Sequence, residues 1–218
     1  MSARLEAALF DFGGVFTDSP FAAAERHGSE LGADPGRVLE LVFGPYDRDT
    51  DHPWHRLERG ELSFAEARDA ILALGLREGL DTDPLAIFSR MSGGGAAREV
   101  VVGRVRELRA AGLRTALVTN NVREFRDRWR QLLPVGELFE LVVDSSEVGV
   151  RKPDPAIFRI ALEGLGGIHP TRAVFLDDYA GNVAAARAVG LHAIHVGEDP
   201  GEALAALDAL LGVPSPVS

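Results

Sequence analysis

The sequence predicts an α/β fold in which a doubly wound parallel sheet is interrupted, after its first strand, by a helical insert. From about residue 95 onward, short apolar runs alternate with segments of helical periodicity, as expected for a parallel sheet with helices on both faces. Between about residues 20 and 90, only helical periodicity occurs. A short apolar run precedes that stretch and ends at Asp11.

The elements near the N-terminus follow from local patterns. The run 7–10, Ala-Ala-Leu-Phe, is short, apolar and followed by glycines, which is typical of a buried strand. In the insert, apolar residues fall on helical faces. Ser63 followed by Glu66 forms a capping-box pattern, which predicts a helix start. Three consecutive glycines at 93–95 then indicate a flexible joint.

After that joint, strand and helix patterns alternate along the chain. Pro155 at the first turn of one helical pattern and Gly190 just after another mark helix boundaries. The predicted strands are 113–118, 139–143, 173–176 and 191–196, and the predicted helices are 97–111, 122–133, 155–165, 179–189 and 202–211. We therefore expect a Rossmann-like core at 1–17 and 95–218 and a helical insert at 18–94.

Composition narrows the classes of function. The chain has 218 residues, 46% of them hydrophobic, which fits a globular core with a modest insert. No apolar run approaches the ~18 residues that a membrane span needs, so no membrane partner is expected. The net charge of −10 argues against nonspecific nucleic-acid binding, which depends on basic residues. The absence of cysteine and of a secretory signal pattern predicts a cytoplasmic protein, and no feature indicates an oligomeric state.

Polar side chains follow several predicted strands at the points where these end. They are Asp11, Thr119, Asn120, Lys152, Asp177 and Asp178. In a doubly wound sheet, ligands bind beyond the carboxyl ends of the strands, so these residues are expected to converge. Lys152 is the only lysine among the 23 Lys and Arg residues. An ammonium is a compact point charge that a guanidinium does not replace. Alone, this single lysine fits a functional position and chance in an arginine-rich chain about equally, and its place among these polar residues favours function.

These residue types fit phosphoryl chemistry. A carboxylate can act as a covalent nucleophile, but its attack on a phosphoryl group brings two anions together. A hard cation held by the oxygens of Asp11 and Asp177 would neutralise that charge. Lys152 can pair with Asp11 and with phosphoryl oxygens, and the Thr119 hydroxyl and nearby backbone N–H groups can hold the remaining oxygens. Catalysis of this kind depends on positioning and charge stabilisation.

Four segments carry a family resemblance. They are 9–15 (Leu-Phe-Asp-Phe-Gly-Gly-Val), 117–120 (Leu-Val-Thr-Asn), 150–158 (Val-Arg-Lys-Pro-Asp-Pro-Ala-Ile-Phe) and 175–190, which begins Phe-Leu-Asp-Asp. In order and spacing, they resemble the four motifs of the haloacid dehalogenase superfamily over nearly the whole chain. The insert resembles that superfamily's mobile cap. The first segment is most similar to the amino-terminal phosphatase domain of soluble epoxide hydrolases.

The resemblance implies a Mg²⁺-dependent hydrolase, most simply a phosphatase of a small phosphorylated metabolite that forms an aspartyl-phosphate intermediate. It implies that Asp11 is the nucleophile, that Thr119 binds the phosphoryl group and that Lys152 orients it. Phe12, Gly13 and Asn120 would join Lys152 in binding substrate. Asp11, Asp177, Asp178 and the carbonyl of Gly13 would hold the metal, with Asn182 supporting its water ligands.

One position departs from the family pattern. Phosphatases of the superfamily usually carry a second aspartate two positions after the nucleophile, and Gly13 stands there. General acid–base help is typically worth ~10²–10⁴ in rate. His52, His55, Glu58 and Asp18 are candidates to supply it. Without it, turnover is slow, or the leaving group is a good one such as that of an acyl phosphate, or the protein is a catalytically weak phospho-ligand binder or regulator.

Two other activities of the superfamily fit less well. Relatives that dehalogenate substrates without a metal carry a bulky aromatic residue where Gly13 stands, and the pair Asp177-Asp178 suits a cation instead. Metal-free dehalogenation is therefore a lesser alternative. Phosphonate-cleaving relatives need a cap lysine, and the stretch from Pro20 to Arg90 contains none.

Overall fold

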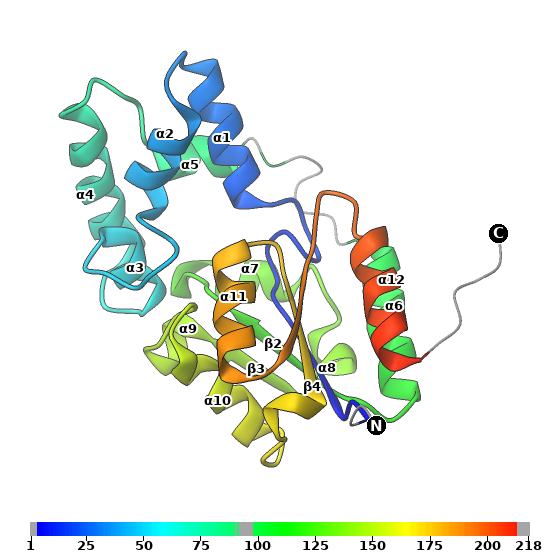
Figure 1. The fold of residues 1–218 in the computed structure, drawn as a ribbon. Coiled ribbons are helices and arrows are strands. Elements are labelled where there is room, and N and C mark those ends of the chain that lie inside the picture. The colour runs from blue at the N-terminus through cyan, green and yellow to red at the C-terminus, as the bar shows by residue number, and fades with distance from the viewer. Residues whose placement is uncertain (1–3, 90, 92–97, 213–218) are drawn as a thin grey trace.

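The computed structural model describes residues 4–89, 91 and 98–212, and a sheet of five parallel strands forms its centre (Figure 1). The strands are β1 (Ala7–Phe10), β2 (Arg114–Thr119), β3 (Leu141–Asp144), β4 (Ala173–Asp177) and β5 (His192–His195). They lie in the order β3-β2-β1-β4-β5, so the chain winds outward from β1 in both directions. This order confirms the predicted doubly wound, Rossmann-like α/β fold.

β1 is the central strand, and its composition reflects that place. Leu9 pairs with Ala116 of β2 on one side and with Phe175 of β4 on the other. All residues of β1 have 0% exposure. A parallel strand that is covered on both faces needs a continuous apolar run, and Ala-Ala-Leu-Phe supplies one. The same burial places Asp11, the next residue, at the end of the sheet.

Helices cover both faces of the sheet (Figure 1). The flanking helices are α6 (Glu99–Ala110), α7 (Arg126–Arg130), α8 (Val135–Leu138), α9 (Ser145–Val148), α10 (Pro155–Gly164), α11 (Ala180–Val189) and α12 (Gly201–Leu211). Successive residues of a strand point to opposite faces. Phe10 therefore packs in the core that α6 and α12 cover, whereas Leu9 packs in the core under α10 and α11.

The described part of the insert, between β1 and α6, carries five helices. They are α1 (Pro20–Glu30), α2 (Pro35–Phe43), α3 (Pro53–Glu58), α4 (Phe64–Leu76) and α5 (Pro84–Phe88). The predicted capping box forms, since the Ser63 hydroxyl accepts from the backbone N–H of Glu66 at 3.3 Å. The helices share a separate apolar core that includes Val42, Phe43 and Ile71. Figure 1 shows them grouped at the end of the sheet where β1 leads into α1.

The predicted helix at 122–133 is interrupted. A 3₁₀ turn at Arg123–Phe125 is followed by the short α7, and the chain then turns before Pro134. The reason is that this segment serves two cores. Val122 belongs to the apolar core of the insert, whereas Trp129 belongs to the core under α6 and α12. One straight helix would not satisfy both, and the sequence pattern does not reveal that division.

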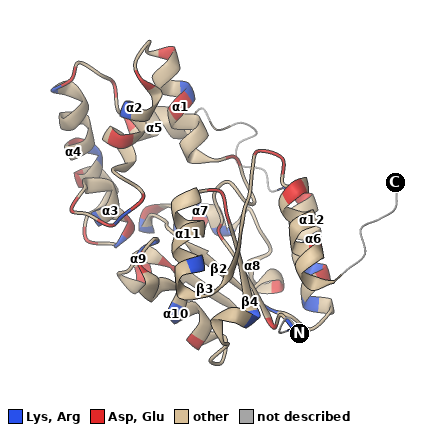
Figure 2. Cartoon of the chain, in the orientation of Figure 1, with Lys and Arg blue, Asp and Glu red and all other residues tan. Residues whose placement is uncertain are grey.

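Some predicted features lie outside the described residues: the joint at 93–95, the boundary at 94/95 and the start of the helix at residue 97. Within the described part, no helix combines the length and apolarity that crossing a membrane requires. Figure 2 shows acidic and basic residues interspersed over the helices.

Replacing Leu117 in β2 with alanine should lower the free energy of unfolding by about 2–5 kcal/mol, because it removes a fully buried side chain from the central layer. Leu76→Ala is the matched control, since Leu76 is 80% exposed at the end of α4 and its loss should change stability by less than about 0.5 kcal/mol. Denaturant unfolding of both variants measures the difference. Equal losses would contradict the described packing.

Candidate active site

The ammonium of Lys152 lies between two carboxylates at the carboxyl ends of β1 and β4. Its Nζ is 2.8 Å from Oδ1 of Asp11 and 2.7 Å from Oδ2 of Asp177. Lys152 and Asp177 are fully buried. Burial disfavours the charge of Lys152, but the two carboxylates outweigh this effect and raise its pKa above the usual value. The single lysine of the chain is thus held as a cation between two strand ends that are remote in sequence.

The first turn of α11 orients Asp177. Nδ2 of Asn182 donates to both carboxylate oxygens at 3.1 Å, and the backbone N–H of Tyr179 donates to Oδ1 at 2.7 Å. Asp177 therefore points into the site from a fixed direction. Oδ1 of Asn182 is buried and has no hydrogen-bond partner, so it can accept from a further ligand.

Three carboxylates gather at this place. Asp11, Asp177 and Asp178 have oxygens within 4.8 Å of one another. Burial raises the pKa of Asp178 well above its usual range, and the charges of Asp177 and Asp11 add to the rise. Burial also raises the pKa of Asp11, with Lys152 opposing and Asp177 adding to it. Three carboxylates here face one ammonium, so negative charge is left uncompensated. Together with the unpartnered amide oxygen of Asn182, they fit a hard divalent cation such as Mg²⁺.

The glycines after Asp11 differ in what they allow. Gly14 has a φ of +72°, and a Cβ there would lie 2.0 Å from Oδ2 of Asp178, so a side chain would displace the third carboxylate. Gly13 has no such restriction, because its Cβ would meet only Pro20, at 3.5 Å. Gly13 lines the cavity beside Asp11.

Asn120 and Thr119 stand at the end of β2, as predicted. The Asn120 side chain spans to the loop that carries Lys152: its Oδ1 accepts from the Lys152 backbone N–H at 2.8 Å, and its Nδ2 donates to the Lys152 carbonyl at 3.0 Å. Nδ2 also donates to the Tyr46 hydroxyl at 3.2 Å. Its amide therefore fixes the lysine loop. Thr119 lies beside it in the cavity wall, with 1% exposure.

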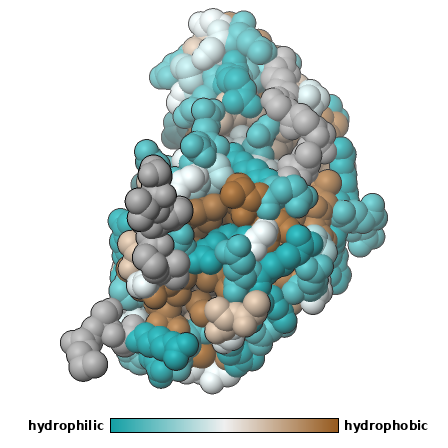
Figure 3. All heavy atoms as spheres, turned by 90° about the vertical axis from the view of Figure 1, so that its right-hand side faces the viewer, coloured by the Kyte–Doolittle hydropathy of each residue, from teal (hydrophilic) through white to brown (hydrophobic). Residues whose placement is uncertain are grey.

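A cavity of about 510 Å³ opens above Asp11, between the insert and the sheet. Its polar end contains Asp11, Thr119 and Lys152, and much of the rest of its wall is aromatic or aliphatic. Phe12 stacks against Trp129 in this wall, with ring centroids 5.2 Å apart. Figure 3 shows apolar residues gathered in the middle of the face that carries α6 and α12. The volume suits a small organic ligand.

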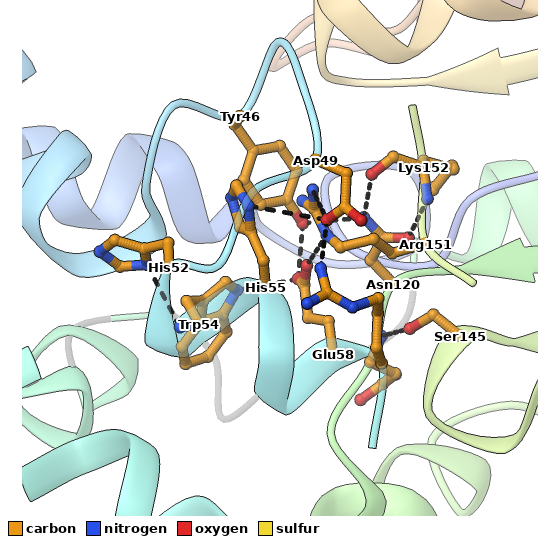
Figure 4. Close-up of polar contacts among 12 residues, drawn as sticks. Tyr46, Asp49, His52, Trp54, His55, Glu58, Asn120, Ser145, Arg151 and Lys152 are labelled. Atoms are coloured by element: carbon orange, nitrogen blue, oxygen red, sulfur yellow. Dashed lines mark hydrogen bonds and ion pairs between the residues drawn. The ribbon is translucent and has the colours of Figure 1, made fainter. Parts of the chain in front are cut away.

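A buried ion pair joins the insert to the lysine loop (Figure 4). Oε2 of Glu58, from α3, accepts from Nε of Arg151 at 2.7 Å. Oε1 of Glu58 accepts from the Tyr46 hydroxyl at 2.6 Å and from the Trp54 indole at 2.8 Å. The guanidinium of Arg151 also lies 4.5 Å from the centroid of the Tyr46 ring, a cation–π contact. Arg151 and Glu58 are 0% and 2% exposed.

The four candidates for a proton-transfer role lie in different places. Only Glu58 lines the cavity, and hydrogen bonds to its neighbours already occupy both of its oxygens. His55 is buried in the insert, where burial lowers its pKa to about 3, and its Nδ1 accepts from the backbone N–H of Thr50. His52 caps α3. Asp18 lines a separate cavity of about 300 Å³ beyond Asp178.

Sequence reasoning missed the roles of Arg151, Tyr46 and Trp54. Arg151 adjoins the single lysine, but nothing in the pattern distinguishes it from the many surface arginines. The available signal was the unusual run Arg-Lys-Pro after a loop, and it does not say that Arg151 turns toward α3. That contact depends on how the insert packs.

A family model for haloacid dehalogenase-like hydrolases matches residues 5–190. The chain belongs to this hydrolase family. Its four motifs coincide with the strand ends and the lysine loop described above, so the resemblance seen in the sequence is confirmed.

Three curated relatives are similar to this hydrolase. Acyl-CoA dehydrogenase family member 10 of Mus musculus is 31% identical over 95% of the chain and 19% of the relative. Bifunctional epoxide hydrolase 2 of Rattus norvegicus is 26% identical over 97% of the chain and 40% of the relative. Sesquiterpene phosphatase astK of Aspergillus oryzae is 27% identical over 90% of the chain and 92% of the relative. The chain thus spans less than half the length of the first two.

A solved structure shares the fold. The HAD family enzyme BT-2542 of Bacteroides thetaiotaomicron, in complex with magnesium and inorganic phosphate, superposes with a TM-score of 0.59 at 21% identity. The superposition covers 89% of this chain and 95% of that one. At this identity the likeness concerns the fold alone.

Removing one partner of the buried pair should destabilise the hydrolase. Arg151→Met leaves Glu58 charged and buried, so we expect a loss of about 3–5 kcal/mol in the free energy of unfolding. The double variant Arg151→Met/Glu58→Gln should recover a large part of that loss, because no buried charge remains unpaired. Arg48→Met is the control, since its pair with Asp47 is exposed and should contribute less than about 1 kcal/mol.

Denaturant unfolding of the unaltered protein, Arg151→Met, Glu58→Gln and the double variant gives the coupling energy of the pair. Arg151→Met and Arg48→Met variants of equal stability would contradict the described ion pair.

Proposed function

We propose that the protein is a Mg²⁺-dependent phosphatase that acts through an aspartyl-phosphate intermediate on Asp11. The observation that carries the proposal is the contact of one buried ammonium with the carboxylates of Asp11 and Asp177, at the polar end of the cavity. Relatives named as phosphatases support it, among them sesquiterpene phosphatase astK. The magnesium and phosphate bound by BT-2542, which has the same fold, agree with it.

Each side chain has a role in the proposed reaction. An oxygen of Asp11 attacks phosphorus, the bond to the leaving oxygen breaks, and water later hydrolyses the acyl phosphate to inorganic phosphate. Lys152 and the Thr119 hydroxyl hold phosphoryl oxygens during transfer. Asp11, Asp177, Asp178 and the Gly13 carbonyl would hold Mg²⁺, which supplies charge neutralisation at the phosphoryl group. Phe12, Gly13 and Asn120 border the small phosphorylated substrate.

We also propose that residues 18–94 act as a cap and that residues 1–17 and 95–218 form the catalytic core. The supporting observation is that α1–α5 have an apolar core of their own and still contribute part of the cavity wall. Side chains of the insert, such as Phe21 and Phe88, face the same cavity as Asp11. A cap in this place would exclude water from the acyl phosphate and select the substrate.

A second candidate function is the binding of a phosphorylated ligand without significant turnover. Gly13 favours it, because no side chain at that position can transfer a proton. Tight binding of phosphorylated ligands by a protein that hydrolyses none of them would support this alternative over the first.

Asp11→Asn should abolish Mg²⁺-dependent hydrolysis of p-nitrophenyl phosphate, because an amide is not a nucleophile for phosphorus. Chelation with EDTA should have the same effect on the unaltered protein, and added Mg²⁺ should restore the rate. Asp69→Asn is the matched control. Asp69 is exposed on α4 and is not among the residues that line the cavity, so its replacement should leave the rate unchanged. Release of p-nitrophenol measures all of these.

Turnover that survives both Asp11→Asn and EDTA would contradict the proposed mechanism. Halide release from a haloacid without Mg²⁺ would instead support dehalogenation. Asp11→Asn would then test whether Asp11 is needed for that reaction.

A further inference from the structure

Much of the wall of the cavity above Asp11 is aromatic or aliphatic, although Thr17, Ser89 and Asn121 also line it. Six of its lining residues are Phe12, Phe21, Phe88, Phe125, Trp129 and Leu132. Of the described residues that line it, only Lys152 and Arg128 carry a positive charge. The charge of Lys152 is already met by Asp11 and Asp177. Sugar hydroxyl groups that lay against these six side chains would find no hydrogen-bond partner there, whereas an aromatic group would pack against them.

Among the described residues that line this cavity, none is placed to hand a proton to a leaving oxygen. A Cβ at Gly13 would meet only carbon atoms of Pro20, at 3.5 and 3.8 Å, so no polar side chain of the described residues fills that place. Lys152 is paired with Asp11 and Asp177, and Asp178 would hold the metal in the proposed function. The titratable groups that remain in the wall are those of Tyr46, Glu58 and Arg128.

None of these three is suited to act as the acid. The Tyr46 hydroxyl already donates to Glu58 at 2.6 Å, and burial, together with the Glu58 charge, raises the pKa of Tyr46 well above its usual value. Both oxygens of Glu58 accept hydrogen bonds from Arg151, Tyr46 and Trp54. Arg128 remains, and arginine is not among the side chains that usually serve as general acids.

A leaving group that departs from this site must therefore be stable without a proton. Aliphatic alcohols have a pKa close to that of water, about 15.7, and leave poorly as alkoxides. Phenols ionise near pKa ~10, as the tyrosine side chain does, and leave readily as phenolates.

We propose, on the basis of the proposed phosphatase function, that the substrate is an aryl phosphate: the phosphate monoester of an apolar phenol. The bond between phosphorus and Asp11 forms as the bond between phosphorus and the aryl oxygen breaks, and the electron pair leaves on that oxygen as phenolate. Water then cleaves the acyl phosphate, which yields inorganic phosphate and regenerates the Asp11 carboxylate. The phenolate takes up a proton from solvent after its release.

The test compares four substrates with the full chain and Mg²⁺: 1-naphthyl phosphate, n-hexyl phosphate, glucose 6-phosphate and phosphoglycolate. The organic groups of naphthyl and hexyl phosphate are both apolar, so this pair compares leaving groups of different acidity. We expect kcat/KM for naphthyl phosphate to exceed that for hexyl phosphate by at least ~10², the scale of general-acid assistance. Glucose 6-phosphate and phosphoglycolate should react at least as slowly as hexyl phosphate.

Gly13→Asp gives an independent readout, since a carboxyl group there can act as the missing acid. Its Cβ fits at an ordinary van der Waals distance of 3.5 Å from Pro20. We expect the ratio of the rate with hexyl phosphate to the rate with naphthyl phosphate to rise by ~10-fold or more, because acid assistance matters most for the poorer leaving group. Gly13→Asn is the matched control, because it has the same size but no transferable proton, and it should give no such rise. Thermal unfolding verifies that both variants fold.

The aromatic wall can be tested separately. Phe88→Leu should raise KM for naphthyl phosphate several-fold and leave KM for acetyl phosphate, which is too small to reach that wall, unchanged.

The outcomes separate the two proposals. Hydrolysis of hexyl phosphate or glucose 6-phosphate within ~10-fold of naphthyl phosphate would overturn the inference and leave the phosphatase function standing. Hydrolysis of none of the phosphate esters would overturn the phosphatase function, and the inference with it.

Discussion

The buried ammonium of Lys152 is the interaction on which the rest of the site depends. An unpaired charge in the interior costs several kcal/mol, so Lys152 can be fully buried only because two carboxylates face it. The converse also holds, since Asp11 and Asp177 stand at the ends of adjacent strands and would repel each other without the cation between them. The pairing thus fixes β1, β4 and the lysine loop relative to one another.

A second constraint involves Arg151, the residue before Lys152. Arg151 turns away from Lys152 and pairs with Glu58 in the insert, while Lys152 points to the strand ends. Asn120 holds the backbone of Lys152 and also contacts the Tyr46 hydroxyl, which donates to Glu58. One short loop is therefore fixed from both sides. This arrangement links the position of the insert to the position of the ammonium through a continuous set of hydrogen bonds.

The apolar wall and the charged cluster are adjacent because the insert follows β1 directly. The chain leaves the sheet at Asp11 and enters α1 at Pro20, so the first helix stands beside Asp11. Electrostatic contacts are stronger in such a mostly apolar space than in water.

The sequence by itself determined the fold class, the strand ends and the charged cluster. Apolar runs such as 7–10 are short and buried on both faces, and in a parallel sheet their carboxyl ends meet, so Asp11, Thr119 and Asp177 had to converge. Lys152 was identifiable because it is the only lysine. Only the tertiary structure decided that Asn120 holds the lysine loop, that Arg151 is buried against Glu58, and that the segment 122–133 breaks to serve two cores. These contacts join residues far apart in the chain, and local periodicity carries no information about which surface of the insert meets the sheet.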